Sequence, residues 1–444
     1  MFIARTRTTV DSRGELVLVE ANVEGLLGVF SWISHILLCI LWCAHCSLPP
    51  IKPEPAKASS ASVTTLPNGL VVVTEDAAST STVTMTYPKA GSGSEELGEL
   101  GAALVNKCLA FNSGSGLSTI MINRTIENEG AVPFVSADRF AATLGYTVEP
   151  ANAVGLVPLL ATDCTFEKWD VRDAKALAGY QITEANKSAQ IVLTEQIFAA
   201  AYGPQSPMGR PFYSEVASTH EIASFRSRGY GLSGAILTAT GIKDHSAFCT
   251  EVSELLKESP VAAPGDTPST PYIGGESRVA APSAGYAHVA LSFGTSVPSA
   301  MRNVVKHLFT ISGSGVSGFE TMGLVGVYAG APSEGVGSLE SAMIKAVTAK
   351  ATAEAVNKAK TLAKAEALFA LDCGSKGLAA AMTASVMESG SFTNASALAS
   401  SYDSITEKDV NSTLASLLKT NPSLAAVGDI TSLPYQGTFA SALK

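Results

Sequence analysis

One order of strand and helix patterns occurs twice along the chain, and this repetition limits the fold more than any single motif does. The first pass begins with β-branched segments at 65–76 and 81–88, followed by helical patterns at 97–111 and 119–129 and a strand at 140–149. Helical patterns at 151–164 and 169–201 come next, and a strand at 233–242 and a helix at 246–259 close the pass. The second pass has strands at 286–295, 322–332 and 424–430, with helical patterns at 299–312, 338–371 and 376–388. Two passes in one order predict an internal duplication, an α+β protein of two homologous halves.

Segments rich in proline, glycine, alanine and serine divide the 444 residues. Residues 259–283 have the composition of an interdomain linker, and residues 47–62 that of a second linker. We therefore expect a leader at 1–62, an N-terminal half at 63–258, a linker at 259–283 and a C-terminal half at 284–444.

The leader contains an apolar run at 26–43, at the lower limit for a membrane span and also suited to a signal sequence. Four acidic residues precede the apolar run: Asp11, Glu15, Glu20 and Glu24. A mitochondrial transit peptide, in contrast, is rich in arginine and poor in acidic residues. An unusual leader, a membrane anchor and a wrongly assigned start all stay open.

Charge and cysteine usage exclude some classes of protein. The 30 basic and 39 acidic residues give a net charge of −9, so nucleic acid is not an expected partner. Only 16% of the residues are charged, which favours extensive buried or subunit-covered surface.

The seven cysteines form no disulfide framework and favour a reducing compartment. The cluster Cys39, Cys43, His45 and Cys46 has no second ligand pair at zinc-finger spacing, so we do not expect a metal there.

Glycine-rich motifs and histidines suggest no cofactor or catalytic site. The GSGVSG sequence at 313–318 follows a helical pattern rather than a strand, so we interpret it as a loop and not as a dinucleotide fingerprint. GSGS at 91–94 lacks the Lys-Ser/Thr ending of a phosphate loop and reads as a turn, and the chain has no GxSxG elbow. The histidines of the two halves are far apart in sequence and are expected to be ordinary packed or surface residues; they are His220, His245, His288 and His307.

A succession of short segments resembles the inverted zinc peptidases, the family of the mitochondrial processing peptidase, and most of all its non-peptidase relatives, the core proteins of ubiquinol:cytochrome c reductase (respiratory complex III). The segments are LPNGLVVV, AGSGSEELGELG, ENEG, FAATLGYTVE, AYG and TATGIKDHSAF in the first half, and YIGGESR, YAHVALSF, MGLVGVYAG and AKTLAKAEAL in the second. The likeness runs from Thr64 to near the C-terminus. It implies two halves, each a mainly antiparallel sheet with helices packed on one face, closing around a central cavity.

In active members of this family an HxxEH sequence on the first helix binds zinc and supplies the general base. The resemblance places this pattern on residues 104–108, where Leu104, Lys107 and Cys108 stand in place of the two histidines and the glutamate. Leu104 has no lone pair for a metal, and Lys107 brings a positive charge where a base belongs. The third ligand is a glutamate on the next long helix, where Glu184 is the candidate, although an isolated carboxylate on a helix is usually solvated.

The helical spacing of Leu100, Leu104, Cys108 and Phe111 predicts that this face packs into a core. We therefore expect a dismantled site, with no catalytic, cofactor-binding or metal-binding residues.

The resemblance implies a non-catalytic, matrix-facing subunit of complex III at the mitochondrial inner membrane. Its expected partners are core protein one or a processing-peptidase β-like subunit, together with cytochrome b and cytochrome c1. The alternative is the non-catalytic, substrate-binding α subunit of the processing peptidase, which carries a long glycine-rich loop that only residues 311–318 match here. An active peptidase is a third class, disfavoured by Leu104, Lys107 and Cys108.

Overall fold

The computed structural model forms two units, Met1–Lys57 and Ala58–Lys444. It describes residues 61–443 except 115, 162, 215–217, 260 and 262–269, and the backbone of 9–10 and 16–17. In the first unit β1 (Thr9–Val10) pairs antiparallel with β2 (Leu16–Val17). The apolar run at 26–43 and the cysteine cluster at 39–46 lie outside the described residues. Within the described ranges, no helix is both long enough and apolar enough to cross a bilayer.

The second unit contains two mixed sheets with related strand orders. The six-stranded sheet has the order β3-β4-β8-β5-β7-β6 and the five-stranded sheet the order β11-β12-β10-β13-β9. In each sheet the last strand in sequence lies between two earlier strands, parallel to one (β4 or β9) and antiparallel to the other (β5 or β10). The strands are β3 (Ala61–Thr65), β4 (Val71–Glu75), β5 (Ser81–Pro88), β6 (Val132–Ala137), β7 (Ala141–Val148), β8 (Ile236–Ala239), β9 (Glu276–Ala280), β10 (Tyr286–Gly294), β11 (Val316–Thr321), β12 (Leu324–Pro332) and β13 (Ser423–Gly428).

The predicted helices occur in the predicted order among the strands, together with four that were not predicted, at Thr219–Gly229, Ala395–Asp403, Glu407–Leu417 and Gln436–Ala442. Those before the linker are α2 (Ala102–Cys108), α3 (Thr119–Asn128), α4 (Val157–Leu160), α5 (Lys168–Lys187), α6 (Ala189–Tyr202), α7 (Thr219–Gly229) and α8 (His245–Leu255). Those after it are α9 (Ser299–Ser312), α10 (Val336–Thr348), α11 (Ala353–Asp372), α12 (Gly374–Ser389), α13 (Ala395–Asp403), α14 (Glu407–Leu417) and α15 (Gln436–Ala442).

The central strands β5 and β10 are buried on both faces of their sheets, and successive side chains of each strand point to opposite sides. In β10, Val289 and Leu291 join the large core formed with α9, α10, α11 and α14, whereas Ala290 belongs to a separate apolar cluster with α6. In the other sheet, Val83 and Met85 of β5 face the core formed with α3, α4 and α8.

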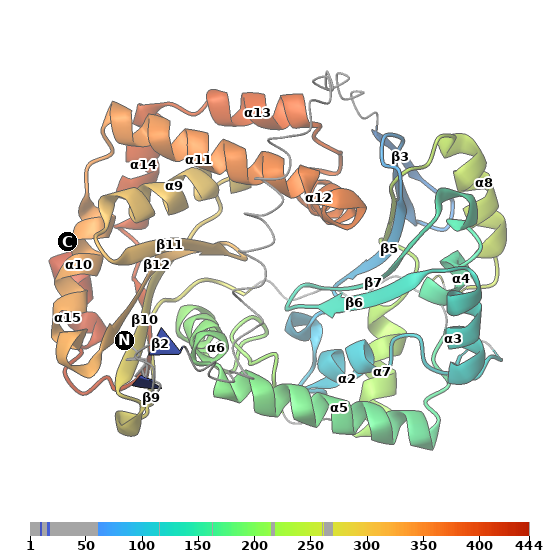
Figure 1. Ribbon diagram of the computed structural model, residues 1–444, viewed down its shortest axis with the longest axis horizontal. Helices are drawn as coiled ribbons and strands as arrows, with labels where there is room; N and C mark the ends of the chain where they lie inside the picture. Colours follow the sequence, from blue (N-terminus) through green and yellow to red (C-terminus); the bar gives the residue numbers. More distant parts are fainter. Residues whose placement is uncertain are drawn as a thin grey trace. The chain divides into compact units, whose positions relative to one another are not determined.

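The two halves exchange one helix each. α6, from the N-terminal half, packs on β13, β10 and β9, on the side of that sheet away from α9 and α11 (Figure 1). α12, from the C-terminal half, packs on β5 and β8 of the other sheet. The sequence predicted helices on one face of each sheet. The structure adds one helix on the second face, α6 on the five-stranded sheet and α12 on the six-stranded sheet.

Most predicted elements are present, and the exceptions have local causes. The stretch at 169–201 divides at Ser188, an extended residue whose side chain caps α6 by accepting from the Ile191 amide at 3.5 Å. The helix expected at 97–111 is shortened to α2 because Gly98 and Gly101 before it, and Phe111 after it, have positive φ angles. The GSGVSG sequence is a loop only over residues 313–315, and its last three residues begin β11.

Candidate functional site

The crossing of α2 and α5 carries the residues that the resemblance assigns to the zinc site. α2 starts after Gly101, which is left-handed at φ 80°. The Leu104 side chain is fully buried in an apolar cluster with residues of α5 and α7, among them Ala178 and Phe225. This position contributes packing and offers no lone pair to a metal.

Lys107 and Cys108 are bridged by one side chain of α5. Lys107 Nζ donates to Gln181 Oε1 at 3.3 Å, and Gln181 Nε2 lies 3.6 Å from Cys108 Sγ. Burial raises the pKa of the Cys108 thiol, and the positive charge of Lys107 only partly offsets this effect. A thiol with a raised pKa stays protonated near neutral pH, so Cys108 is neither an activated nucleophile nor a ready thiolate ligand.

The candidate acid Glu184 does not reach this crossing. It lies on the exposed side of α5, where it accepts from Lys187 Nζ at 2.6 Å, with about 70% of its side chain exposed. Gln181, one turn earlier on the helix, occupies the position facing α2. The neutral side chains of Cys108 and Gln181 and the cation of Lys107 do not fit a zinc ion, which takes thiolate, imidazole or carboxylate ligands. Among the residues that the structure describes, no group of three or more His, Cys, Asp or Glu could hold a metal ion.

The predicted apolar stripe is only partly correct. Leu104 is buried and Cys108 packs against the same cluster. Leu100 precedes the helix, because the left-handed Gly101 comes between them, and is 36% exposed. Phe111 lies after the helix and contacts the core of the six-stranded sheet instead.

A buried carboxyl group holds the start of α2. Glu95 is 4% exposed and accepts from the Ala103 amide at 2.8 Å and the Gly101 amide at 3.3 Å. Burial raises the pKa of Glu95 to about 7, although both of these hydrogen bonds favour the ionised form and act against the rise. The group is committed to the local backbone, so it supports the helix rather than a substrate.

The four histidines of the two halves differ in their surroundings: three contact different side chains, and the fourth is exposed. His245 contacts the hydroxyl groups of Thr64 at 2.7 Å and Thr74 at 2.8 Å, and His288 Nδ1 lies 2.7 Å from Tyr328 Oη. His307 Nε2 lies 2.7 Å from Glu366 Oε2, and His220 is exposed on α7.

The contact of His307 marks a counterpart of the α2–α5 crossing in the other half. Glu366 lies 13 residues after Ala353, the first residue of α11, and Gln181 lies 13 residues after Lys168, the first residue of α5. Glu366 accepts from Lys306 at 2.6 Å and contacts His307, as Gln181 contacts Lys107 and Cys108. Sequence reasoning missed this pair, although the Lys-Cys and Lys-His dipeptides on corresponding helices were a signal for it.

Comparisons with known proteins give partial sequence matches and one shared fold. No protein-family model matches the chain. The chain is 28% identical over 280 residues, 60% of its length, to the mitochondrial-processing peptidase subunit alpha of Solanum tuberosum. It is 28% identical over 166 residues, 36% of its length, to the human mitochondrial cytochrome b-c1 complex subunit 2. These matches span 55% and 35% of the two relatives, so the chain matches about half or less of each.

A solved structure shares the fold. One chain of complex III2 from Candida albicans with Inz-5 bound superposes with a TM-score of 0.74, covering 86% of this chain and 99% of that one, at 17% identity. This likeness confirms the predicted fold class of two α+β halves.

Proposed function

We propose that this chain is a structural subunit, core protein two, of mitochondrial ubiquinol:cytochrome c reductase, with no zinc-peptidase activity of its own. The observation that carries the lack of peptidase activity is the α2–α5 crossing, where Leu104, Lys107, Cys108 and Gln181 replace a metal site with apolar packing, a lysine and two hydrogen bonds. The likeness to the human cytochrome b-c1 subunit and the fold shared with a complex III chain support it.

The proposed partners are core protein one, or a processing-peptidase β-like subunit, and through it cytochrome b and cytochrome c1. The proposed location is the matrix side of the mitochondrial inner membrane. A chain with 46% hydrophobic and only 16% charged residues suits a permanent interface, and obligate interfaces commonly bury more than about 2,000 Å².

The second candidate is the non-catalytic α subunit of the processing peptidase, which the longer match to the Solanum tuberosum protein favours. The resemblance implies a long glycine-rich loop for such a subunit. Here α9 ends at Ser312 and β11 begins at Val316, so the corresponding loop is a three-residue turn. Its first residue is closely packed, because a Cβ at Gly313 would lie 2.9 Å from that of Val316.

Solubilisation of organelles in a mild detergent, followed by native electrophoresis, separates the two candidates. We expect the chain to migrate with cytochrome b and cytochrome c1, and its depletion to lower the whole complex while presequence cleavage continues. The same purified complex should carry no zinc attributable to this chain. Migration as a cytochrome-free heterodimer, with uncleaved precursors after depletion, would establish the peptidase α subunit instead.

A further inference from the structure

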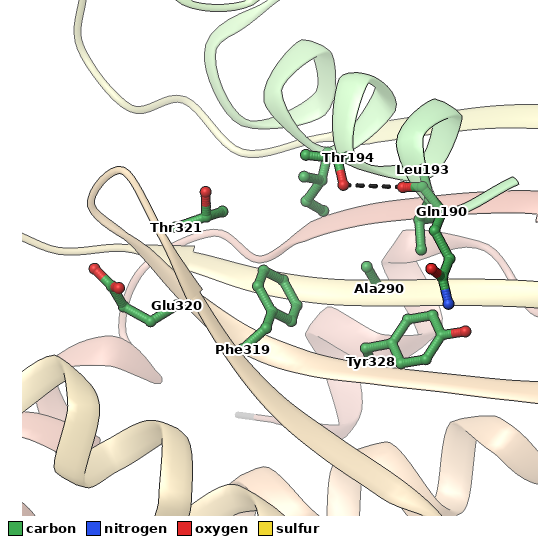
Figure 2. A pocket seen from close by; sticks show the side chains of 9 residues that line it. Gln190, Leu193, Thr194, Ala290, Phe319, Glu320, Thr321 and Tyr328 are labelled. Atoms are coloured by element: carbon green, nitrogen blue, oxygen red, sulfur yellow. Dashed lines mark hydrogen bonds between the residues drawn. The ribbon is translucent and has the colours of Figure 1, made fainter. Parts of the chain in front are cut away.

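A cavity of about 290 Å³ lies between α6 of the N-terminal half and strands β10, β11 and β12 of the C-terminal half. Figure 2 shows α6 on one side of it, with Phe319 and Tyr328 on the other. A pocket built where two parts of a chain meet is a common location for a ligand.

The floor and walls of the pocket are apolar. Ala290 of β10 is 3% exposed, and its short side chain leaves the space between the larger side chains of the sheet and the helix. Leu193 and Ile197 of α6 form the facing wall. The two aromatic rings of the sheet offer faces and edges on which a further ring can pack.

The polar groups around the pocket are neutral or already paired. The Tyr328 hydroxyl is held by His288 Nδ1 at 2.7 Å, and the Glu320 carboxylate is paired with Arg302 at 2.8 Å. Thr194 Oγ1 donates to the Gln190 carbonyl oxygen at 2.9 Å. Among the described residues, none forms a hydrogen bond with the side-chain amide of Gln190, which lies exposed at the rim. Gln190 thus offers the pocket an uncommitted amide that can both donate and accept, and the Thr321 hydroxyl also lies in the lining.

We propose that this pocket binds an uncharged aromatic ring of one or two fused rings that carries one hydrogen-bonding group. An apolar cavity of about 150 Å³ is large enough for benzene, so the larger volume here suits an indole or a phenol. A charged ligand is disfavoured, since the carboxylate in the lining is already neutralised by Arg302. The inference is independent of the proposed function, because it uses no residue of the α2–α5 crossing.

The ring can come from a free compound or from a tryptophan or tyrosine side chain of a peptide. Strand addition along β11 is obstructed at Gly318, whose amide already donates to Thr310 Oγ1 at 2.8 Å. A peptide would therefore bind through its ring, with its backbone outside the sheet.

The test is ligand-observed NMR on the full-length chain with indole, N-acetyl-tryptophanamide and a serine-rich peptide with one central tryptophan. We expect indole to bind with a dissociation constant on the order of 1 mM or below, as for a small ligand of high efficiency. Ala290→Phe, which fills the cavity, should weaken binding at least tenfold. Gln190→Ala should weaken it severalfold, while Gln205→Ala, an exposed glutamine outside the pocket, should leave it unchanged.

Absence of binding at millimolar indole, or binding that survives Ala290→Phe, would overturn the proposal. If Ala290→Phe fails to fold, nuclear Overhauser contacts from indole to the Phe319 and Tyr328 rings decide the matter in the native chain, and their absence is equally negative. With the site established, a peptide that binds as tightly as N-acetyl-tryptophanamide identifies a peptide side chain as the source. A tenfold weaker peptide identifies a free compound.

Discussion

The α2–α5 crossing in the N-terminal half and the α9–α11 crossing in the C-terminal half use matching positions for different chemistry. In the first, a lysine and a cysteine contact a glutamine on the long helix; in the second, a lysine and a histidine contact a glutamate. Four residues before the cysteine stands the fully buried Leu104, and four before the histidine stands the half-buried Asn303. The duplication has thus preserved where the helices meet, while the side chains at the contact have diverged.

The shared lysine is the most informative part of this comparison. Lys107 and Lys306 each donate to the facing side chain of the long helix, at 3.3 Å and 2.6 Å. A positive charge at this position repels a metal cation in either half. What differs is the environment: Leu104 in the first crossing is fully buried in apolar packing, whereas 53% of the Glu366 side chain in the second crossing is exposed.

The largest expected effect on the free energy of unfolding comes from placing a histidine at Leu104 in the first crossing, compared with a histidine at the matching Asn303 in the second. Leu104→His removes a fully buried leucine and leaves an imidazole without a designed partner, so we expect a loss of about 2 to 5 kcal/mol in unfolding free energy. Asn303→His replaces a half-buried residue that donates to Tyr402 Oη at 3.2 Å, with an expected loss of about 1 kcal/mol. Urea denaturation of the full-length variants measures both.

Leu104→Met is the control for this pair, because it keeps volume and apolarity and should cost less than about 1.5 kcal/mol. Equal losses for the two histidine variants would show that the two crossings are packed alike. Neither variant is expected to gain hydrolysis of a presequence peptide, since Lys107 remains and Gln181 is not an acid.

The N-terminal ends of α2 and α9 give the next comparison. Glu95, buried, accepts from amides at the start of α2, and Glu388, exposed, accepts from the Ser299 amide at the start of α9 at 3.1 Å. Because burial raises the pKa of Glu95 to about 7 from a usual value of 4.5, folding resists its ionisation. Its contribution to stability is fully present below pH 4.5 and is lost as the pH rises through 7, by about 3 kcal/mol.

Glu95→Gln should flatten this part of the stability profile, because an amide does not ionise. Glu388→Gln, at an exposed position, should change the profile by less than about 0.5 kcal/mol. Unfolding free energies measured from pH 4 to pH 8 test both. A profile in which Glu95→Gln keeps the wild-type slope would place the proton uptake elsewhere.

Much of the fold was predictable because the strongest sequence signals are local. The helix at Ser299–Ser312 was predicted with its observed bounds, since its apolar residues recur at helical spacing. The edge strands β6, β9 and β11 were missed, because partly exposed strands lack a continuous apolar run; β9 lies inside the segment predicted as a linker at 259–283. The exchange of α6 and α12 was also not predictable, since an apolar helix face does not specify which sheet covers it.

The candidate site also has a part that the sequence predicts and a part that only the structure shows. Leu104 and Lys107 were sufficient to predict that zinc does not fit, because this depends on the residue type alone. The role of Gln181 required the structure, since choosing it over Glu184 depends on which face of α5 meets α2. The pocket beside Ala290 also left no sequence signal, because it is formed by segments about 100 residues apart.

The smallest expected effect separates the two crossings by the nature of their contacts. The pKa of Glu366 is lowered: burial alone would raise it, but hydrogen bonds from Lys306 and His307 outweigh that. Glu366→Gln removes a half-exposed ionic contact and should cost about 0.2 to 1 kcal/mol at low salt, less at high salt. Gln181→Leu removes one long hydrogen bond from the Lys107 ammonium and one long contact with Cys108, neither of which is an ion pair, so its effect, within about 0.5 kcal/mol, should depend little on salt. Urea denaturation at low and high sodium chloride measures both differences, and a salt-dependent loss for Gln181→Leu would mean that the first crossing is also ionic.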